Sequence, residues 1–357
     1  MRAPGAPGVI QLTNDLPTVT FVITSFNYGR YLEQCIQSAV DQTHRSEVIV
    51  VDDGSTDESS DVLNAFGSDI VVINQNHEGQ GAAINRVIAA ATGDVILLLD
   101  SDDWMSTSRA ELVAQEFAND STVDWLIHNV SVLAEGRDDR WQALYTFGSA
   151  DQLLTDLLQV GDTWATTSGL SFRKGFLEKL GPIPGDFNIY PDSYLLCSAI
   201  LMGRATILDE ALTFRRLHDS QASGQRRLDR NQAIRSINMK HQLSERVGNL
   251  ASADPQLPRC LANRATWWQA KAGLQHTKCR RESTRREVVQ GWARLVRAVL
   301  AEDMPRATKA LMVLRDTGLV ALPRREYPLI WWLMHYGRPR WLHSWTDRIA
   351  VSVPRTR

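Results

Sequence analysis

Short apolar runs and amphipathic segments alternate between residues 17 and 100, and this alternation limits the possible folds more than any other feature. The expected strands are TVTFVITS, EVIVVDD, DIVVINQ and DVILLLD, and the expected helices between them are YLEQCIQSAVDQT, SSDVLNAF and GAAINRVIAAAT. Strands and helices in strict turn are typical of an α/β fold with a mainly parallel sheet. We therefore predict such a sheet, flanked by helices, in the N-terminal part of the chain.

The last of these strands ends in an unusual group of carboxylates. In VILLLDSDDW, residues 95–104, five apolar residues precede Asp100, Asp102 and Asp103. The apolar run predicts a strand that is buried on both faces. Carboxylates this close repel one another and raise one another's pKa, so they are tolerated in solvent or beside a cation. Asp103 is also placed to cap the next helix.

Polar segments follow all four predicted strands. They are TSFN, DDGSTD, NQNHEG and DSDD, in chain order. Because the carboxyl ends of parallel strands meet at one edge, where such sheets bind their ligands, we expect one shared site there. Asp53 in the second segment can accept the imide N–H of a pyrimidine base. Thr24 and Phe26 can frame that base by hydrogen bonding and stacking, although a phenylalanine here can equally be packing. One residue of Ser55–Asp57 is expected to cap the following helix.

The composition is that of a globular protein, with 43% hydrophobic and 22% charged residues. The four cysteines form no CxxC pair, which argues against a zinc site or a disulfide scaffold and favours a reducing compartment. Residues 1–16 lack the apolar core of a signal peptide and are expected to form a flexible leader. No stretch reaches the roughly 18 apolar residues of a membrane span. We therefore expect a cytoplasmic protein.

The charge is divided unevenly along the chain. The first 220 residues carry 13 basic and 31 acidic side chains, whereas the remaining residues carry 26 and 10. Helical periodicity predominates in this second part, which predicts a basic, Trp-rich helical extension over residues 224–357. Its tryptophans are Trp267, Trp268, Trp292, Trp331, Trp332, Trp341 and Trp345. They can contact the headgroups of an anionic membrane or pack against the first domain. No nucleic-acid-binding module accompanies them, so no nucleic acid is expected.

Residues 17–104 resemble the nucleotide-sugar-binding half of the family 2 glycosyltransferases, which have the GT-A fold. The similarity is carried by PTVTFVITSFNYGRYLEQCIQSAVDQTHRSEVIVVDDGSTDES and NHEGQGAAINRVIAAATGDVILLLDSDDW, and it continues less distinctly to residue 223. The resemblance implies a GT-A domain over residues 17–223. It also implies a catalyst that moves a sugar from a nucleoside diphosphate to an acceptor hydroxyl, with inversion at the anomeric carbon.

The resemblance also implies roles for individual residues. DSD at 100–102 matches the DxD motif of the family, which places Asp100 near the ribose and Asp102 on a divalent ion, Mg²⁺ or Mn²⁺. His218 in RRLHDSQAS matches a position near the diphosphate and the metal, although a surface histidine is the alternative. IYPDSYLL matches the region of the general base, so Asp192 takes that role, and Pro191 stands where relatives carry Glu. Arg215 and Arg216 can contact phosphate or the acidic first half.

Two motifs that other functions require are missing from the sequence. TSFNYG stands where a Rossmann dinucleotide-binding site needs GxGxxG, so a dinucleotide site is rejected. The QxxRW motif of processive family members is absent, so transfer of one sugar per encounter is expected. UDP is the expected carrier, with dTDP and GDP open, and the acceptor can be a carbohydrate, glycolipid or glycopeptide. A catalytically silent nucleotide-sugar-binding protein and a sugar-phosphate nucleotidyltransferase remain the rival interpretations.

Overall fold

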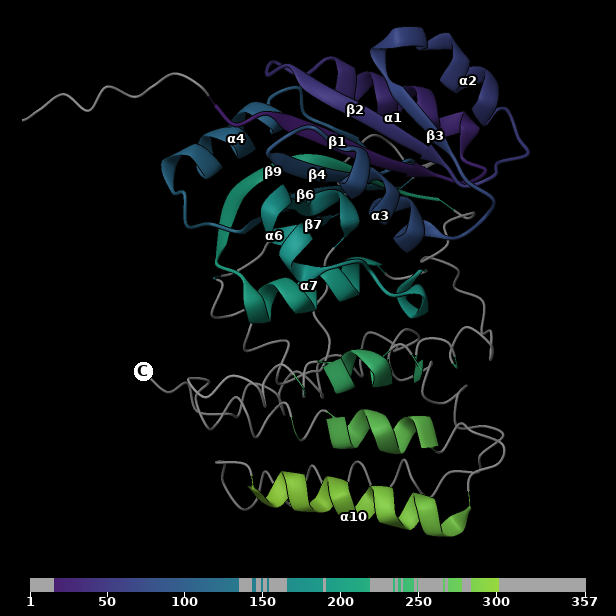
Figure 1. Ribbon diagram of the computed structural model, residues 1–357, viewed down its shortest axis with the longest axis vertical. Coiled ribbons are helices and arrows are strands. Elements are labelled where there is room, and N and C mark those ends of the chain that lie inside the picture. Colours follow the sequence, from purple (N-terminus) through teal and green to yellow (C-terminus); the bar gives the residue numbers. More distant parts are fainter. Residues whose placement is uncertain are drawn as a thin grey trace, which may run out of the picture.

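The computed structural model is centred on a sheet with helices on both faces (Figure 1). It describes residues 16–134, 143–145, 149, 153, 166–188, 191–218, 234, 237–238, 240–246, 249, 266, 269–277 and 284–301. The strands within these residues are β1 (Val19–Ser25), β2 (Ser46–Asp52), β3 (Val71–Asn74), β4 (Val95–Asp100), β5 (Trp104–Met105), β6 (Trp125–Ala134), β7 (Ala143–Tyr145), β8 (Leu170–Arg173) and β9 (Ala205–Leu217). The helices are α1 (Gly29–Val40), α2 (Ser59–Ala65), α3 (Gln80–Ala90), α4 (Arg109–Asn119), α6 (Lys174–Leu180), α7 (Pro191–Met202) and α10 (Arg285–Ala301), with short 3₁₀ turns at Gly67–Asp69, Thr167–Gly169 and Gly185–Phe187.

The sheet combines a parallel half with a mixed half. Its strand order is β3-β2-β1-β4-β8-β6-β9-β5, and β7 pairs with β6. The first four strands in sequence pair in parallel, which confirms the α/β prediction for residues 17–100. Beyond β4, strand β8 is antiparallel to both β4 and β6, while β9 is parallel to β6. The alternation of strands and helices in residues 17–100 did not predict this mixed half of the sheet.

Strand β4 is buried on both faces, as its apolar run predicted. Val95, Leu97 and Leu99 pack into one hydrophobic cluster with residues of α1 and α4. Ile96 and Leu98 pack into the opposite cluster with residues of α3, α6 and α7. Because successive side chains of a strand point to opposite faces, this division fixes the register of the strand. The carboxylates that follow Leu99 are thereby held at the end of the strand.

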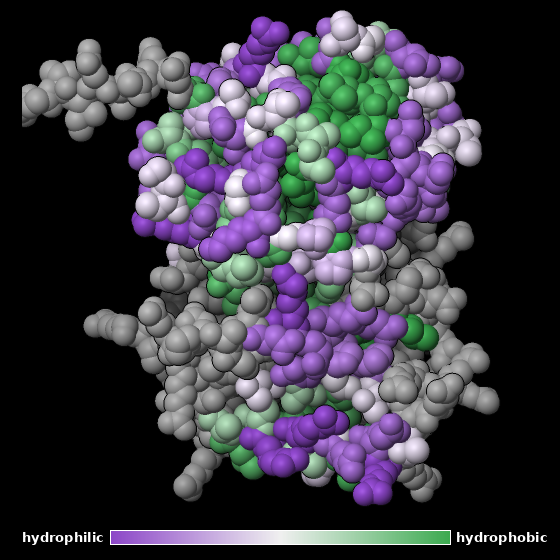
Figure 2. Space-filling model, in the orientation of Figure 1, coloured by the Kyte–Doolittle hydropathy of each residue, from purple (hydrophilic) through white to green (hydrophobic). Residues whose placement is uncertain are grey.

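Strand β3 forms one edge of the sheet and is less covered than its neighbours. Val71 and Val72 are 49% and 37% exposed, and Figure 2 shows hydrophobic side chains gathered on this end of the molecule. The strand is only four residues long, which limits the unpaired backbone that it presents.

The described part of the C-terminal third is helical and packs beneath α7 (Figure 1). Leu295, Ala298 and Val299 of α10 belong to the same hydrophobic cluster as α7, and Trp292 packs against that cluster. Trp292 is thus partly buried, while direct packing of this tryptophan against the first domain stays a prediction. The other six tryptophans named above lie outside the described residues, and the boundary at residue 223 stays a prediction. Among the described helices, none has the length and apolar character needed to span a bilayer.

The buried His128 of β6 is expected to make the free energy of unfolding depend on pH. Its side chain is fully buried, and burial, followed by the positive charge of Arg109, lowers its pKa from 6.5 to about 3. The unfolded chain therefore takes up a proton near pH 6.5, whereas the folded protein does not. Stability is lost as the pH falls through that range, and this histidine alone costs about 2 kcal/mol between pH 7 and pH 5.

Urea unfolding at pH 7 and pH 5 measures this cost. We expect His128→Gln to lose about 2 kcal/mol less than the natural protein on acidification, because glutamine does not titrate. The comparison is made between the two pH values within each protein, so any constant cost of the substitution cancels. An identical loss in both proteins would contradict the prediction.

Candidate active site

Four strands of the parallel half end side by side. The register pairs Ser25 of β1 with Asp52 of β2, and Asp52 with Asn74 of β3. On the other side of β1, Thr24 lies opposite Asp100 of β4. The polar segments that follow these strands therefore meet at one edge of the sheet, as the sequence predicted.

Asp100, Asp102 and Asp103 form a compact carboxylate cluster at the end of β4. One oxygen from each lies within 4.8 Å of the others. Burial, followed by the negative charges of Asp102 and Asp192, raises the pKa of Asp100 to about 7. Burial and the same cluster raise the pKa of Asp103 well above its ordinary value. Carboxylate oxygens are the ligands that hard divalent cations prefer, so this donor set fits Mg²⁺ or Mn²⁺.

His218 lies directly beside this cluster. Its Nε2 atom is 3.1 Å from Oδ2 of Asp102, and its side chain is fully buried. The rings of Tyr31 and Tyr28 pack against the imidazole, with centroids 4.6 and 5.6 Å away. The structure thus brings together the two residues that the sequence assigned to the metal. The alternative of an exposed surface histidine is wrong.

Asp103 does not cap the next helix, so that prediction is corrected. Helix α4 begins at Arg109, after the short strand β5. The two carboxylate oxygens of Asp103 instead accept hydrogen bonds from the hydroxyl of Ser168 at 2.6 Å and from the backbone N–H of Arg216 at 3.0 Å. Asp103 therefore joins the end of β4 to two segments that are distant in sequence.

Arg216 contacts the acidic first half of the chain, which was one of the two predicted roles. Its Nε donates a hydrogen bond to the backbone oxygen of Asp102 at 3.1 Å. Its guanidinium carbon lies 4.7 Å from the ring centroid of Tyr31 and 4.7 Å from that of Trp104. The two rings and the carbonyl hold this cation against the carboxylate cluster.

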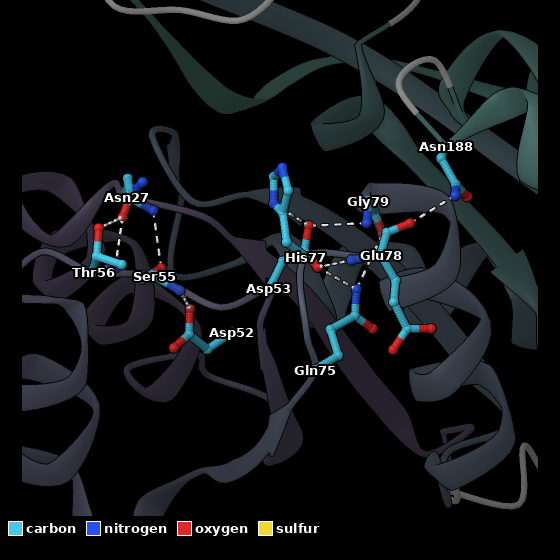
Figure 3. Close-up of polar contacts among 10 residues, drawn as sticks. All are labelled: Asn27, Asp52, Asp53, Ser55, Thr56, Gln75, His77, Glu78, Gly79 and Asn188. Atoms are coloured by element: carbon cyan, nitrogen blue, oxygen red, sulfur yellow. Dashed lines mark hydrogen bonds and ion pairs between the residues drawn. The ribbon is translucent and has the colours of Figure 1, made fainter.

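Asp53 anchors the β3–α3 loop, which comprises residues 75–79 (Figure 3). Its Oδ1 accepts hydrogen bonds from Nε2 of Gln75 at 2.7 Å and from the N–H of Glu78 at 2.6 Å. Its Oδ2 accepts from the N–H of Gly79 at 3.0 Å and lies 3.5 Å from Nδ1 of His77. Asp53 therefore fixes the shape of this loop, a role that sequence reasoning missed.

Phe26 and Thr24 lie beside the same loop. Phe26 is 37% exposed, and its ring packs in a tilted arrangement against His77, with centroids 4.1 Å apart. The hydroxyl of Thr24 accepts a hydrogen bond from Nε2 of Gln80 at 3.2 Å, and the same amide donates to Oδ1 of Asp100 at 2.7 Å. His77 and Gln80 were missed because NHEGQG indicated only a glycine-bearing loop. The placement of these side chains comes from the fold.

The predicted cap of α2 by a residue of Ser55–Asp57 is corrected, because Glu58 is the N-cap residue, but Asp57 supports the start of the helix from the preceding position. Its Oδ1 accepts a hydrogen bond from the N–H of Ser59, the first residue of α2, at 3.1 Å. Its Oδ2 accepts from the N–H of Gly29, the first residue of α1, at 2.9 Å. Ser55 instead accepts from the N–H of Asn27 (Figure 3). One carboxylate thus supports the start of two helices.

Asp192 reaches the site from the second half of the fold. Helix α7 begins at Pro191, and Asp192 lies in its first turn, where its Oδ1 accepts the N–H of Ser193 at 2.8 Å. Proline is well suited to a first helical position. After burial and Asp102, the charge of Asp192 is the next cause of the raised pKa of Asp100. The charge of Asp192 therefore acts electrostatically on the carboxylate cluster, and its role as the base stays a prediction.

The sequence of this region matches a known family. Residues 20–181, which include β1 to β4 and the carboxylate cluster, match the model of glycosyl transferase family 2. This region of the chain is similar to that family. The match ends before α7, so the assignment of Asp192 as a base stays a prediction.

Relatives extend the similarity beyond that region. The chain is 34% identical over 210 residues to an uncharacterised glycosyltransferase of Nostoc sp. strain PCC 7120, covering 56% of the chain and 65% of the relative. It is 37% identical over 114 residues to a poly(ribitol-phosphate) beta-glucosyltransferase of Bacillus spizizenii, covering 30% and 18%. The chain thus spans less than two thirds of either relative.

A solved structure supports the fold. The crystal structure of S. aureus TarS 1–349 in complex with UDP superposes with a TM-score of 0.55 and 16% identity, covering 87% of this chain and 91% of that one. At this identity the likeness concerns the fold alone. It confirms the predicted GT-A architecture together with a helical C-terminal region.

Proposed function

We propose that this chain transfers a sugar from a nucleoside diphosphate to an acceptor hydroxyl. The observation that carries the proposal is the carboxylate cluster at the end of β4, with His218 beside Asp102. The charge of Asp192, from α7, acts on Asp100 of this cluster. The carboxylate cluster suits a cation that would bind the diphosphate of the donor. The carboxylate of Asp192 can receive a proton. A site that only bound a nucleotide sugar would not need Asp192 in this position.

A divalent ion, Mn²⁺ or Mg²⁺, would be held by Asp102, with His218 as a further ligand. Such an ion neutralises the negative charge of the diphosphate and stabilises it as a leaving group. Asp100 is proposed to contact the ribose. Without a cation, an anionic donor would approach a half-chain with 31 acidic and 13 basic side chains, which electrostatics opposes.

Asp192 is proposed to act as the general base. Its carboxylate accepts the proton of the acceptor hydroxyl while the oxygen forms a bond to the anomeric carbon. The bond between that carbon and the diphosphate oxygen breaks, and its electron pair leaves with the nucleoside diphosphate. Attack from the face opposite the leaving group inverts the anomeric configuration.

UDP is the proposed carrier. Oδ2 of Asp53 accepts one hydrogen bond from Gly79, and a carboxylate oxygen can accept a second from the imide N–H of uracil. Phe26 is partly exposed beside it and would stack on the base. TarS, which shares the fold, has been crystallised with UDP and with UDP-GlcNAc. The donor sugar is a separate question.

The acceptor is proposed to be a carbohydrate, glycolipid or glycopeptide, with one sugar added per encounter. A peripheral position on the cytoplasmic face of an anionic membrane, through the basic C-terminal helices, stays a prediction. Val289 and Leu300 of α10 are 62% and 60% exposed, which gives that helix some apolar surface. Apart from Trp292, the tryptophans that could contact the membrane lie outside the described residues.

A thermal-shift screen of UDP, dTDP and GDP, each with and without Mn²⁺, tests the proposal. At about one hundred times the dissociation constant a ligand stabilises the fold by about 3 kcal/mol, so we expect UDP with Mn²⁺ to raise the Tm by several degrees. Neither component alone should do so. Absence of a shift with every nucleotide would overturn the proposal.

The product then separates the rival functions. A glycosyltransferase releases a nucleoside diphosphate from the nucleotide sugar. A sugar-phosphate nucleotidyltransferase would release pyrophosphate from a nucleoside triphosphate instead. A silent binding protein would bind UDP with Mn²⁺ but release nothing, and Asp192→Asn would then change no rate.

A further inference from the structure

Asn188 holds the β3–α3 loop from the side opposite Asp53 (Figure 3). Its Nδ2 donates a hydrogen bond to the backbone oxygen of Glu78 at 2.6 Å. Its own backbone oxygen accepts the N–H of Gly81, in the first turn of α3, at 3.2 Å. The loop is therefore bound on one side by the end of β2 and on the other by the segment that leads into α7.

The loop approaches Asn188 closely because it has glycines there. Gly79 has a φ of +92°, and a Cβ added to it would lie 2.8 Å from Cβ of Asn188. A Cβ added to Gly81 would lie 2.9 Å from Oδ1 of Asn188. Any larger residue at either position would push Asn188 away, and Gly79 also has a backbone conformation that other residues rarely adopt.

Residues at this loop contact the carboxylates proposed to bind the donor and also the segment that precedes the proposed base. Gln80, which follows the loop, donates to Oδ1 of Asp100 at 2.7 Å. Asn188 stands four residues before Asp192. A displacement of the loop would therefore act at once on the carboxylates proposed to contact the donor and on the segment that carries the proposed base. Within the part of the chain that the structure describes, the contacts of Asn188 connect this loop to the segment that precedes α7.

We propose that Asn188 is a positioning residue that couples occupancy of the donor site to the placement of Asp192. A nucleotide that engages Asp53 and Asp100 fixes the β3–α3 loop, and the loop then fixes the start of α7 through Asn188. This inference rests on the proposed function, because it takes the edge of the sheet as the donor site. Coupling of this kind is a difference in free energy between two linked sites.

Amide hydrogen exchange with UDP and Mn²⁺ as the probe tests the coupling without an acceptor. In the natural protein we expect the probe to slow exchange in residues 75–81 and also in α7. In Asn188→Asp, which removes the amide donor at nearly constant size, the loop should still be protected. The protection of α7 should fall by at least about fivefold.

Asn85→Asp is the matched control. Asn85 lies on α3 and exchanges two hydrogen bonds with the backbone of Ile183, both 2.9 Å long, so it joins the same two segments without touching the loop. This variant should keep the ligand-induced protection of α7. If Asn85→Asp loses that protection as fully as Asn188→Asp does, any contact between these two segments supports α7 equally. The inference about Asn188 is then wrong.

The remaining outcomes are also decisive. A merely structural asparagine would raise exchange in α7 equally with and without the probe, which would overturn the coupling. Retained protection of α7 in Asn188→Asp would do the same. If Asn188→Asp fails to fold, Gly81→Ala provides the second variant, because its added Cβ displaces the intact Asn188 side chain. No protection of the natural protein by the probe would instead reject the proposed donor site.

Discussion

Asp192→Asn is expected to lower the turnover number by about 10²- to 10⁴-fold, the usual contribution of a positioned proton acceptor. The amide has nearly the same size but cannot take the proton of the acceptor hydroxyl. Because Asp192 is not among the residues proposed to bind the nucleotide or the ion, the affinity for UDP with Mn²⁺ should change by less than about threefold. Release of UDP and calorimetric titration measure the two quantities.

Ser193→Ala is the control for this prediction. Ser193 follows Asp192 in the first turn of α7 and donates its backbone N–H, which alanine keeps, to the Asp192 carboxylate. Its turnover should remain within about threefold of the natural protein. Retention of more than a tenth of the natural rate in Asp192→Asn would show that another group accepts the proton.

The sequence predicted the parallel half of the fold because its information there is local. Each buried strand of that half has a continuous apolar run, and each helix shows one apolar face, so both periods are visible within about ten residues. The carboxyl ends of β1 to β4 follow from the parallel topology alone. This is why Asp100, Asp102 and Asp53 were correctly brought to one edge of the sheet.

The rest of the site depends on contacts between distant residues, which no local pattern contains. Asp103 was expected to cap a helix because helix caps are local, but its partners Ser168 and Arg216 lie 65 and 113 residues away. The packing of His77 against Phe26 likewise requires two loops to meet. Sequence reasoning found the residues that are chemically distinctive and missed the amides and rings that hold them in place.

Asp102→Asn is expected to weaken the binding of UDP with Mn²⁺ by at least about 10²-fold. Even residues that only support a metal ligand change metal affinity by about 10- to 100-fold, and Asp102 is the proposed ligand itself. The variant removes one negative charge from a cluster whose oxygens lie within 4.8 Å of one another. The pKa of Asp100, which burial and then Asp102 raise to about 7, should fall. The metal-free variant should therefore be no less stable than the natural protein at pH 8.

Binding and stability are thus expected to change in opposite directions, and that pairing distinguishes a lost metal site from a damaged fold. The Tm without ligand should stay or rise, while the shift caused by UDP with Mn²⁺ disappears. Asp120→Asn is the matched control, since Asp120 lies after α4 and bonds Thr122 on the surface. It should keep the full shift. Tight Mn²⁺-dependent binding by Asp102→Asn would contradict the prediction. It would show that the ion does not need Asp102 as a ligand.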